Sequence, residues 1–215
     1  TLDGNGKTLT STAGRAINIE TEGKVVINNL TVKAAERAFN IINKAATVEL
    51  NDVTATANNN AVMIATTAGA AKVSINDCNF TGLAVVNVAG AESNVAIKNS
   101  TITNVDASTS EQYGAITVWS SAKAAEVNVE NTEINVAGDS MEAYVFPGDA
   151  IVNGVEQVGY IVATIGDGGY ETLASAIGSA KGGDVITLVR DITASAAIVI
   201  DKAITLDGNG KKLTS

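Results

Sequence analysis

Histidine is absent from this chain of 215 residues, and cysteine and proline occur only once each. Without histidine, the chain lacks the commonest general base, the usual partner of a nucleophilic serine or cysteine, and the commonest zinc ligand. The single cysteine, Cys78, has no second thiol with which to form an internal disulfide. We therefore expect no cofactor and no catalytic residue, and carboxylates remain the main groups available for acid–base or metal chemistry.

Aromatic residues make up only 4% of the chain, whereas the apolar residues together reach 46%. A chain of this length and apolar content can bury a core, and its Ala, Val, Ile, Asn and Thr favour many short strands joined by polar turns. No apolar run approaches the length of a transmembrane helix, so we expect no membrane insertion. The net charge of −9 repels nucleic acid and argues against it as a partner.

Two short phrases recur along the chain and alternate with each other. The first reads apolar-x-apolar-x-[Asn/Asp]-x-x-apolar, and its polar residue recurs at intervals of 23, 25, 22 and 32, at Asn29, Asp52, Asp77, Asn99 and Asn131. The second phrase reads AINI, AFNI, AVMI, VVNV and AITV. Both phrases have a period of two residues, which indicates short β-strands.

The spacing of these phrases is typical of a parallel β-helix with coils of about 22–25 residues. One coil cannot bury its own inward face, whereas coils stacked about 4.8 Å apart bury a continuous apolar column. We therefore predict an all-β solenoid. The longest interval contains NVDASTSEQYG, residues 104–114, which we expect to form a surface loop.

The column of Asn and Asp residues allows two interpretations. In the first it is a ladder of turns, because both residue types tolerate left-handed backbone geometry and stacked asparagines bond one another. In the second, Asp52 and Asp77 lie about 5 Å apart on adjacent coils and hold calcium or serve glycoside hydrolysis. A lyase or hydrolase would also need Arg37 or a lysine in the same groove. No third acidic ligand follows, since the next coil carries Asn99.

Two aromatic residues, Tyr113 and Trp119, flank the expected loop. Because Ile116 and Val118 should point inward, Thr117 and Trp119 should point outward or lie at the turn. An exposed aromatic side chain beside a loop is a candidate contact for a glycan or a partner protein. The alternative is that Trp119 covers a packing seam beneath the loop.

The coil phrase stops near residue 140 and returns near residue 186. Between them, YETLASAIGSAK places Tyr170, Leu173, Ala174, Ile177 and Ala180 on one face of a helix that two glycines terminate. We therefore expect three parts: β-helix coils in 1–146, a junction with a hairpin in 147–168, and in 169–215 a capping helix with the first coils of a next or neighbouring module.

The segment YIVATIGDGGYETLASAIGSAKGGDVITLVRDI, residues 160–192, resembles the N-terminal cap of pectate-lyase-like right-handed parallel β-helices, as in tandem-repeat, adhesin-like bacterial surface proteins. In such proteins a hairpin and a helix plug the open end of the solenoid, and GDVITL would begin the first coil. The resemblance implies a right-handed helix and a secreted protein that is extracellular or on the cell surface. Since the fold hosts both enzymes and inert stalks, the resemblance alone leaves both functions open.

The chain begins with TLDGNGKTLTS and ends with TLDGNGKKLTS, which match at ten of eleven positions with an offset of 204. The cap-like segment precedes the second copy, so reading on from residue 215 to residue 12 gives the expected order of cap and coils. We therefore expect one period of a tandem array, or a subunit that stacks on its neighbour. The partner is then the chain itself, head to tail, through apolar end residues: Leu2, Leu9, Ile204, Leu206 and Leu213.

These observations support three functions, of which we expect the first. It is a structural repeat module of an extracellular stalk, adhesin or self-assembling filament, in which open strand edges seek partners and a head-to-tail contact builds a fibre. The second is a module that binds a glycan or a host surface through the loop around Tyr113 and Trp119. The third is a polysaccharide lyase or hydrolase that uses Asp52 and Asp77.

Overall fold

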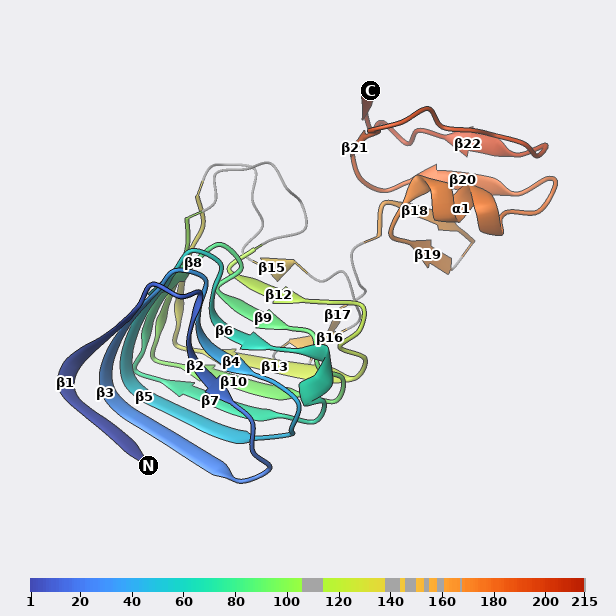
Figure 1. The fold of residues 1–215 in the computed structure, drawn as a ribbon. Helices are drawn as coiled ribbons and strands as arrows, with labels where there is room; N and C mark the ends of the chain where they lie inside the picture. Colours follow the sequence, from blue (N-terminus) through green and yellow to red (C-terminus); the bar gives the residue numbers. More distant parts are fainter. Residues whose placement is uncertain are drawn as a thin grey trace. The chain divides into compact units, whose positions relative to one another are not determined.

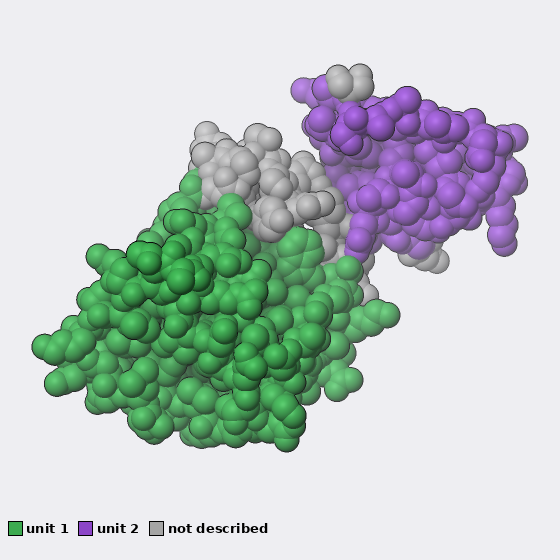
Figure 2. Space-filling model, in the orientation of Figure 1, with its two compact units in different colours: residues 1–158 green, residues 159–215 purple. Residues whose placement is uncertain are grey.

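The chain forms a parallel β-solenoid of about eight turns, with one short helix and a hairpin towards its C-terminus. The predicted all-β solenoid is therefore confirmed. The computed structural model divides into two compact units, Thr1–Val158 and Gly159–Ser215 (Figure 2). It describes the following residues: 1–105, 114–137, 144–145, 150–152, 155–157, 161–166 and 168–214.

One parallel sheet of the first unit carries the first sequence phrase (Figure 1). Its early turns are single long strands: β1 (Leu2–Ser11), β3 (Lys24–Ala34) and β5 (Thr47–Ala57). In later turns the same path is divided into two strands: β7 (Lys72–Asn76) and β8 (Asn79–Gly82), β10 (Asn94–Lys98) and β11 (Thr101–Asn104), and β13 (Ala125–Glu130) and β14 (Glu133–Asn135). The division falls at the Asn or Asp of the phrase, where the chain turns.

A second parallel sheet carries the other phrase. Its strands are β2 (Arg15–Ile19), β4 (Arg37–Ile41), β6 (Asn60–Ile64), β9 (Val86–Val88), β12 (Ile116–Val118) and β15 (Tyr144–Val145). A 3₁₀ turn, η1 (Thr66–Ala68), follows β6. The antiparallel pair β16 (Ala150–Val152) and β17 (Val155–Gln157) lies at the far end of the first sheet.

Equivalent residues of successive turns stack in register, so the solenoid core is a set of aliphatic columns. One column runs through the centre of the first phrase and contains Ile27, Leu50, Ile75, Ile97 and Val129. A second passes through Val32, Ala55, Phe80, Ile102 and Ile134. The rings of Phe39 and Phe80 meet inside the solenoid, with centroids 6.4 Å apart. The period of two in the sequence thus separates inward residues from outward ones.

The outer surface carries ion pairs between turns. Two ion pairs each join one turn to the next. Nζ of Lys24 lies 2.7 Å from Oε1 of Glu49, and Nζ of Lys98 lies 2.7 Å from Oε2 of Glu130. The hydrogen bond from Lys98, together with its positive charge, lowers the pKa of Glu130. Because these groups are exposed to water, such pairs contribute little to stability, and the apolar columns hold the turns together.

The second unit combines a hairpin, a helix and two solenoid turns. The hairpin pairs β18 (Ala163–Ile165) with β19 (Gly168–Tyr170) in antiparallel fashion. The helix is α1 (Leu173–Ser179). The turns contain β20 (Val185–Leu188) with β21 (Ile192–Thr193), then β22 (Thr205–Asp207) with β23 (Leu213–Thr214). None of the helices in the described ranges has the length and apolar content that a membrane span requires.

Helix α1 buries a face that differs by one residue from the predicted one. Leu173, Ala176 and Ile177 are buried, whereas Ala174 is exposed, so its placement in the predicted apolar face was wrong. The hydroxyl of Thr172 accepts a hydrogen bond from the backbone N–H of Ser175 and begins the helix there. The spacing i, i+3, i+4 then places Ala176 and not Ala174 beside Leu173.

Lys202 closes the other end of α1. Its ammonium group donates hydrogen bonds to the carbonyls of Ile177, Gly178 and Ala180 at 3.0, 2.6 and 3.1 Å. The last carbonyls of a helix have no partner within the helix and carry its negative dipole end, so a cation there is doubly favourable. Lys202 thereby ties the loop before β22 to the helix.

We expect Lys202→Met to destabilise the second unit by about 1 kcal/mol, because three carbonyls lose a charged donor. Hydrogen exchange of the α1 amides in the full chain measures the effect, and their protection should fall several-fold. Lys211→Met is the matched control, since Lys211 is an exposed lysine of the same unit and lies between β22 and β23. Equal exchange in both variants would contradict a capping role for Lys202.

Candidate functional site

The Asn and Asp column of the first phrase forms the corners of the solenoid. All five residues have positive φ, at 51°, 52°, 54°, 51° and 45° for Asn29, Asp52, Asp77, Asn99 and Asn131. This left-handed geometry is unfavourable for most side chains, whereas Asn and Asp tolerate it better than other non-glycine residues. The backbone conformation alone therefore accounts for the residue type at each corner.

The longest ladder of side-chain amides lies one residue before the predicted column. Asn51 donates from Nδ2 to Oδ1 of Asn28 at 2.9 Å, and Asn76 donates to Asn51 at 2.9 Å. In the predicted column, such a bond between amides joins only Asn131 to Asn99, at 2.8 Å, among the described residues. The signal in the sequence was the polar pair NN, ND and ND, of which only the second member was selected.

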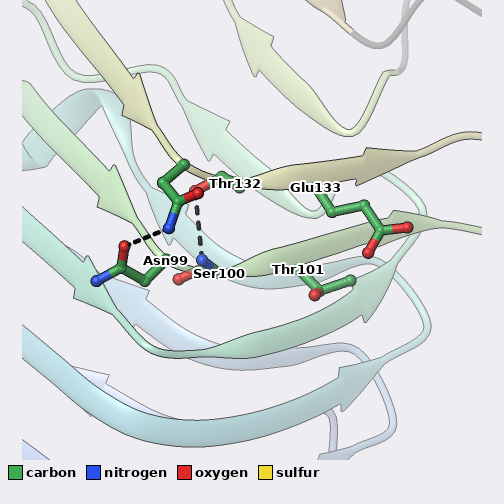
Figure 3. A pocket seen from close by; sticks show the side chains of 6 residues that line it. Asn99, Ser100, Thr101, Thr132 and Glu133 are labelled. Atoms are coloured by element: carbon green, nitrogen blue, oxygen red, sulfur yellow. Dashed lines mark hydrogen bonds between the residues drawn. The ribbon is translucent and has the colours of Figure 1, made fainter.

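Two shallow grooves follow this corner. One is lined by Asn5, Gly6, Asn29, Leu30, Thr31, Asp52 and Thr54. The other is lined by Asn99, Ser100, Thr101, Asn131, Thr132 and Glu133, and its side chains project from neighbouring turns (Figure 3). In it the hydroxyl of Thr132 accepts a hydrogen bond from the backbone N–H of Ser100 at 3.3 Å. Both grooves are open and mostly polar.

The structure places the carboxylates that a lyase or hydrolase would need in one sheet and Arg37 in the other. Asp52 and Asp77 directly follow Asn51 and Asn76, which pair across β5 and β7, so the two carboxylates lie at equivalent corners of adjacent turns, as predicted. Arg37 lies on β4 in the other sheet, beside Arg15 of β2, and donates to Oδ1 of Asn40 at 3.2 Å. In the described part of the chain, no three His, Cys, Asp or Glu residues cluster as a metal site would require.

We expect Asp77→Gly to retain the stability of the native chain, and Asp77→Ala to lower it by about 1 kcal/mol, because only glycine adopts positive φ freely. Urea unfolding followed by circular dichroism measures both. Asn58→Ala is the control, since Asn58 is exposed and is not at a left-handed corner. If 1 mM calcium raised the midpoint of the native chain but not of Asp77→Gly, the calcium interpretation would replace that of a turn.

Cys78 occupies the inward position immediately after a corner. Its side chain is 3% exposed, and Sγ donates to the carbonyls of Asn76 and Leu50 at 3.1 and 3.4 Å. Burial raises the pKa of the thiol from its ordinary value of 9.0 to about 11. Thiolate is the nucleophilic form, so Cys78 is a packing residue and not a reactive one.

We expect Cys78 in the folded chain to react with a disulfide reagent at least about 100-fold more slowly than in denaturant, as only opened molecules expose it. The folded chain keeps this proton to about pH 11, whereas the unfolded thiol titrates near 9.0. Its contribution to stability is therefore full below pH 9 and is lost as the pH rises towards 11. Cys78→Val, which lacks this titration, should show a smaller loss of stability across that interval.

Trp119 follows β12 and is half-buried, in contrast to the exposed aromatic that the contact hypothesis needs. Its indole N–H donates to Oδ1 of Asn87 on the preceding turn at 2.7 Å. Thr117 was expected to point outward or lie at a turn, yet it is fully buried and accepts a hydrogen bond from the N–H of Gly114 at 3.3 Å. Tyr113 and most of the predicted loop lie outside the described residues.

The predicted end residues lie on open edges of the solenoid. Among the described strands, β1 pairs only with β3, β22 only with β20, and β23 only with β21. Leu2, Leu9 and Leu213 are 47%, 38% and 46% exposed, although they continue the inward columns. Ile204 and Leu206 are half-buried against the core of the second unit. Each of these edges therefore offers backbone donors and acceptors beside exposed apolar side chains.

Comparison with protein-family models, with curated proteins and with solved structures finds no match for this chain. The geometry of the chain itself is therefore what bears on its function.

Proposed function

We propose that this chain is a structural repeat module of an extracellular stalk, adhesin or self-assembling filament, joined head to tail by stacking of β-solenoid turns. The observation that carries the proposal is the pair of open edges, which bear the same phrase. Leu2 and Leu9 lie at one edge, and Leu206 and Leu213 lie at the other. The partner at each edge is a further copy of this chain.

Two physical arguments support head-to-tail joining. An uncovered strand edge is a template for pairing with another chain. Burying a fully exposed leucine contributes about 1.5–3 kcal/mol, and Leu2, Leu9 and Leu213, which are 47%, 38% and 46% exposed, would each add roughly half of that. A head-to-tail contact joins different surfaces of identical units. It forms a ring only where the rotation between units returns to the start, and otherwise it forms a fibre.

The hairpin and helix of the second unit support a placement among pectate-lyase-like right-handed β-helices of adhesin-like surface proteins. In this interpretation, α1 and the pair β18–β19 cap the solenoid that begins at β20. A secreted, extracellular or surface-bound location belongs to the same proposal. Binding of a glycan is the second function, and the open polar groove around Ser100, Thr101 and Glu133 favours it.

We expect the purified chain to form rods or filaments in electron microscopy, with an axial repeat of one module. Its average sedimentation coefficient should rise with concentration. Leu206→Glu with Leu213→Glu should return the chain to monomers, because the charges would be buried at the joint. Val199→Glu is the control and should leave assembly unchanged, as Val199 is 72% exposed but lies in no strand.

A monomer at every concentration, with no rods, would contradict self-assembly. In that case the polar groove becomes the first site to test, with Thr101→Ala and Glu133→Ala compared in binding assays against a panel of acidic and neutral polysaccharides. Rods that persist in the double leucine variant would show that the joint uses another surface.

A further inference from the structure

Building on the head-to-tail function proposed above, we propose that residues 205–215 of one copy take the place of β1 on the next copy. Each junction then contains the repeated phrase once, as a single shared turn. The partner surface is the edge of β3 that β1 covers in this structure. The occupant is the C-terminal turn of a second copy of this chain.

The two copies of the phrase adopt the same turn in two separate units. Oδ1 of Asp3 accepts a hydrogen bond from the N–H of Asn5 at 2.9 Å, and Oδ1 of Asp207 accepts one from the N–H of Asn209 at 2.9 Å. The backbone angles also agree: φ is 48° at Asn5 and 69° at Gly6, and 46° and 73° at the equivalent Asn209 and Gly210. The Asp-Gly-Asn-Gly turn therefore has the same geometry at both ends, whereas the phrase is one strand, β1, in the first copy and is divided into β22 and β23 in the second.

Each copy is paired on the edge that the other leaves open. The first copy pairs with the turn that follows it, through Leu2 with Ile27 and Leu9 with Val32. The second copy pairs with the turn that precedes it, through Ile186 with Leu206 and Ile192 with Leu213. Superposing the two copies yields two unbroken inward columns, Ile186–Leu206–Ile27 and Ile192–Leu213–Val32.

The side-chain contacts are divided in the same way. In the first copy, Asp3 accepts a hydrogen bond at 3.4 Å from Nδ2 of Asn29 on the following turn. In the second copy, Nδ2 of Asn209 donates to the carbonyl of Leu188 on the preceding turn at 3.2 Å. Each copy makes one half of the contacts that this sequence can make, and a shared turn makes both halves.

The two copies differ most in the space around their first glycine, Gly4 in one and Gly208 in the other. A Cβ on Gly4 would lie 2.5 Å from the carbonyl oxygen of Asn29 and 2.8 Å from Cα of Leu30, so the turn that follows requires glycine there. The equivalent residue, Gly208, has open space, and its nearest such neighbour is the carbonyl oxygen of Lys211 at 3.9 Å. Gly208 is thus suited to a following turn that is absent from its own unit.

In a covalent tandem array, the length of a solenoid turn also favours sharing. Successive inward residues are 20 residues apart from Ile186 to Leu206 and 25 apart from Leu2 to Ile27. If residue 12 follows residue 215, the interval from Leu206 to the next Ile27 remains 25. If residue 1 followed residue 215, the two phrases would be only 11 residues apart, which is too short for a turn.

The first test is a permuted chain in which residues 159–215 are followed by residues 12–158. We expect it to be a monomer that unfolds in one transition, because the shared turn joins both units. Gly208→Ala should lower its melting temperature by about 5 °C or more, as a clash with backbone atoms would. In the full chain at dilute concentration, Gly208→Ala should leave the melting temperature unchanged, whereas Gly4→Ala should lower it.

A permuted chain that tolerates Gly208→Ala, or that unfolds in two transitions, overturns the inference. The second test uses a chain of residues 12–215, in which only another copy can supply the first turn. We expect it to assemble at a concentration at least about tenfold lower than the full chain, because no β1 has to be displaced. Residues 12–204, which lack both copies of the phrase, are the matched control and should not assemble.

The outcomes separate this inference from the proposed function. If the full chain forms rods and the chain of residues 12–215 does not, the turn is doubled at the joint, so the inference fails and head-to-tail assembly stands. If the permuted chain behaves as expected and no chain assembles in solution, the shared turn stands and the self-assembling filament fails.

Discussion

The stacking of equivalent residues in register is the constraint on which the rest of the molecule depends. Because each inward residue rests on its counterpart one turn away, as in the column from Ile27 to Val129, every turn must change direction at the same point. That requirement places a left-handed residue at each corner and an inward side chain, such as Cys78, just after it. The corner, the amide ladder and the buried thiol are thus consequences of one repeated geometry.

Most of the fold could be predicted from the sequence, because a repeated phrase reports the same environment several times. The strands, the parallel stacking and the helix followed from the period of the apolar residues, and Ala174 was misplaced by an error of register within a helix of only seven residues. The contacts that side chains make on the outer surface could not be predicted from the sequence. Trp119 is half-buried through a bond to Asn87, a residue 32 positions earlier that no local pattern connects with it.

The candidate sites differ in how far local chemistry determines them. The corner residues can be predicted from residue type, since few residues other than Asn, Asp and Gly accept positive φ. The ladder of Asn28, Asn51 and Asn76 forms because the three amides lie on the same side of their strands. The sequence does not predict that side, because the turn at the corner interrupts the alternation of inward and outward side chains. The open edges could be predicted from the sequence because a phrase of eleven residues occurs twice, with ten positions identical.

The direction of the backbone hydrogen bonds has a mechanical consequence. They connect one turn to the next, so they run along the solenoid axis, and a pulling force along that axis acts on them directly. A turn that opens frees about 22–25 residues, from one inward residue to its counterpart, or roughly 75 Å of extended chain. A rod built in this way would respond to sudden tension by lengthening one turn at a time, with each step dissipating energy before the covalent chain becomes taut.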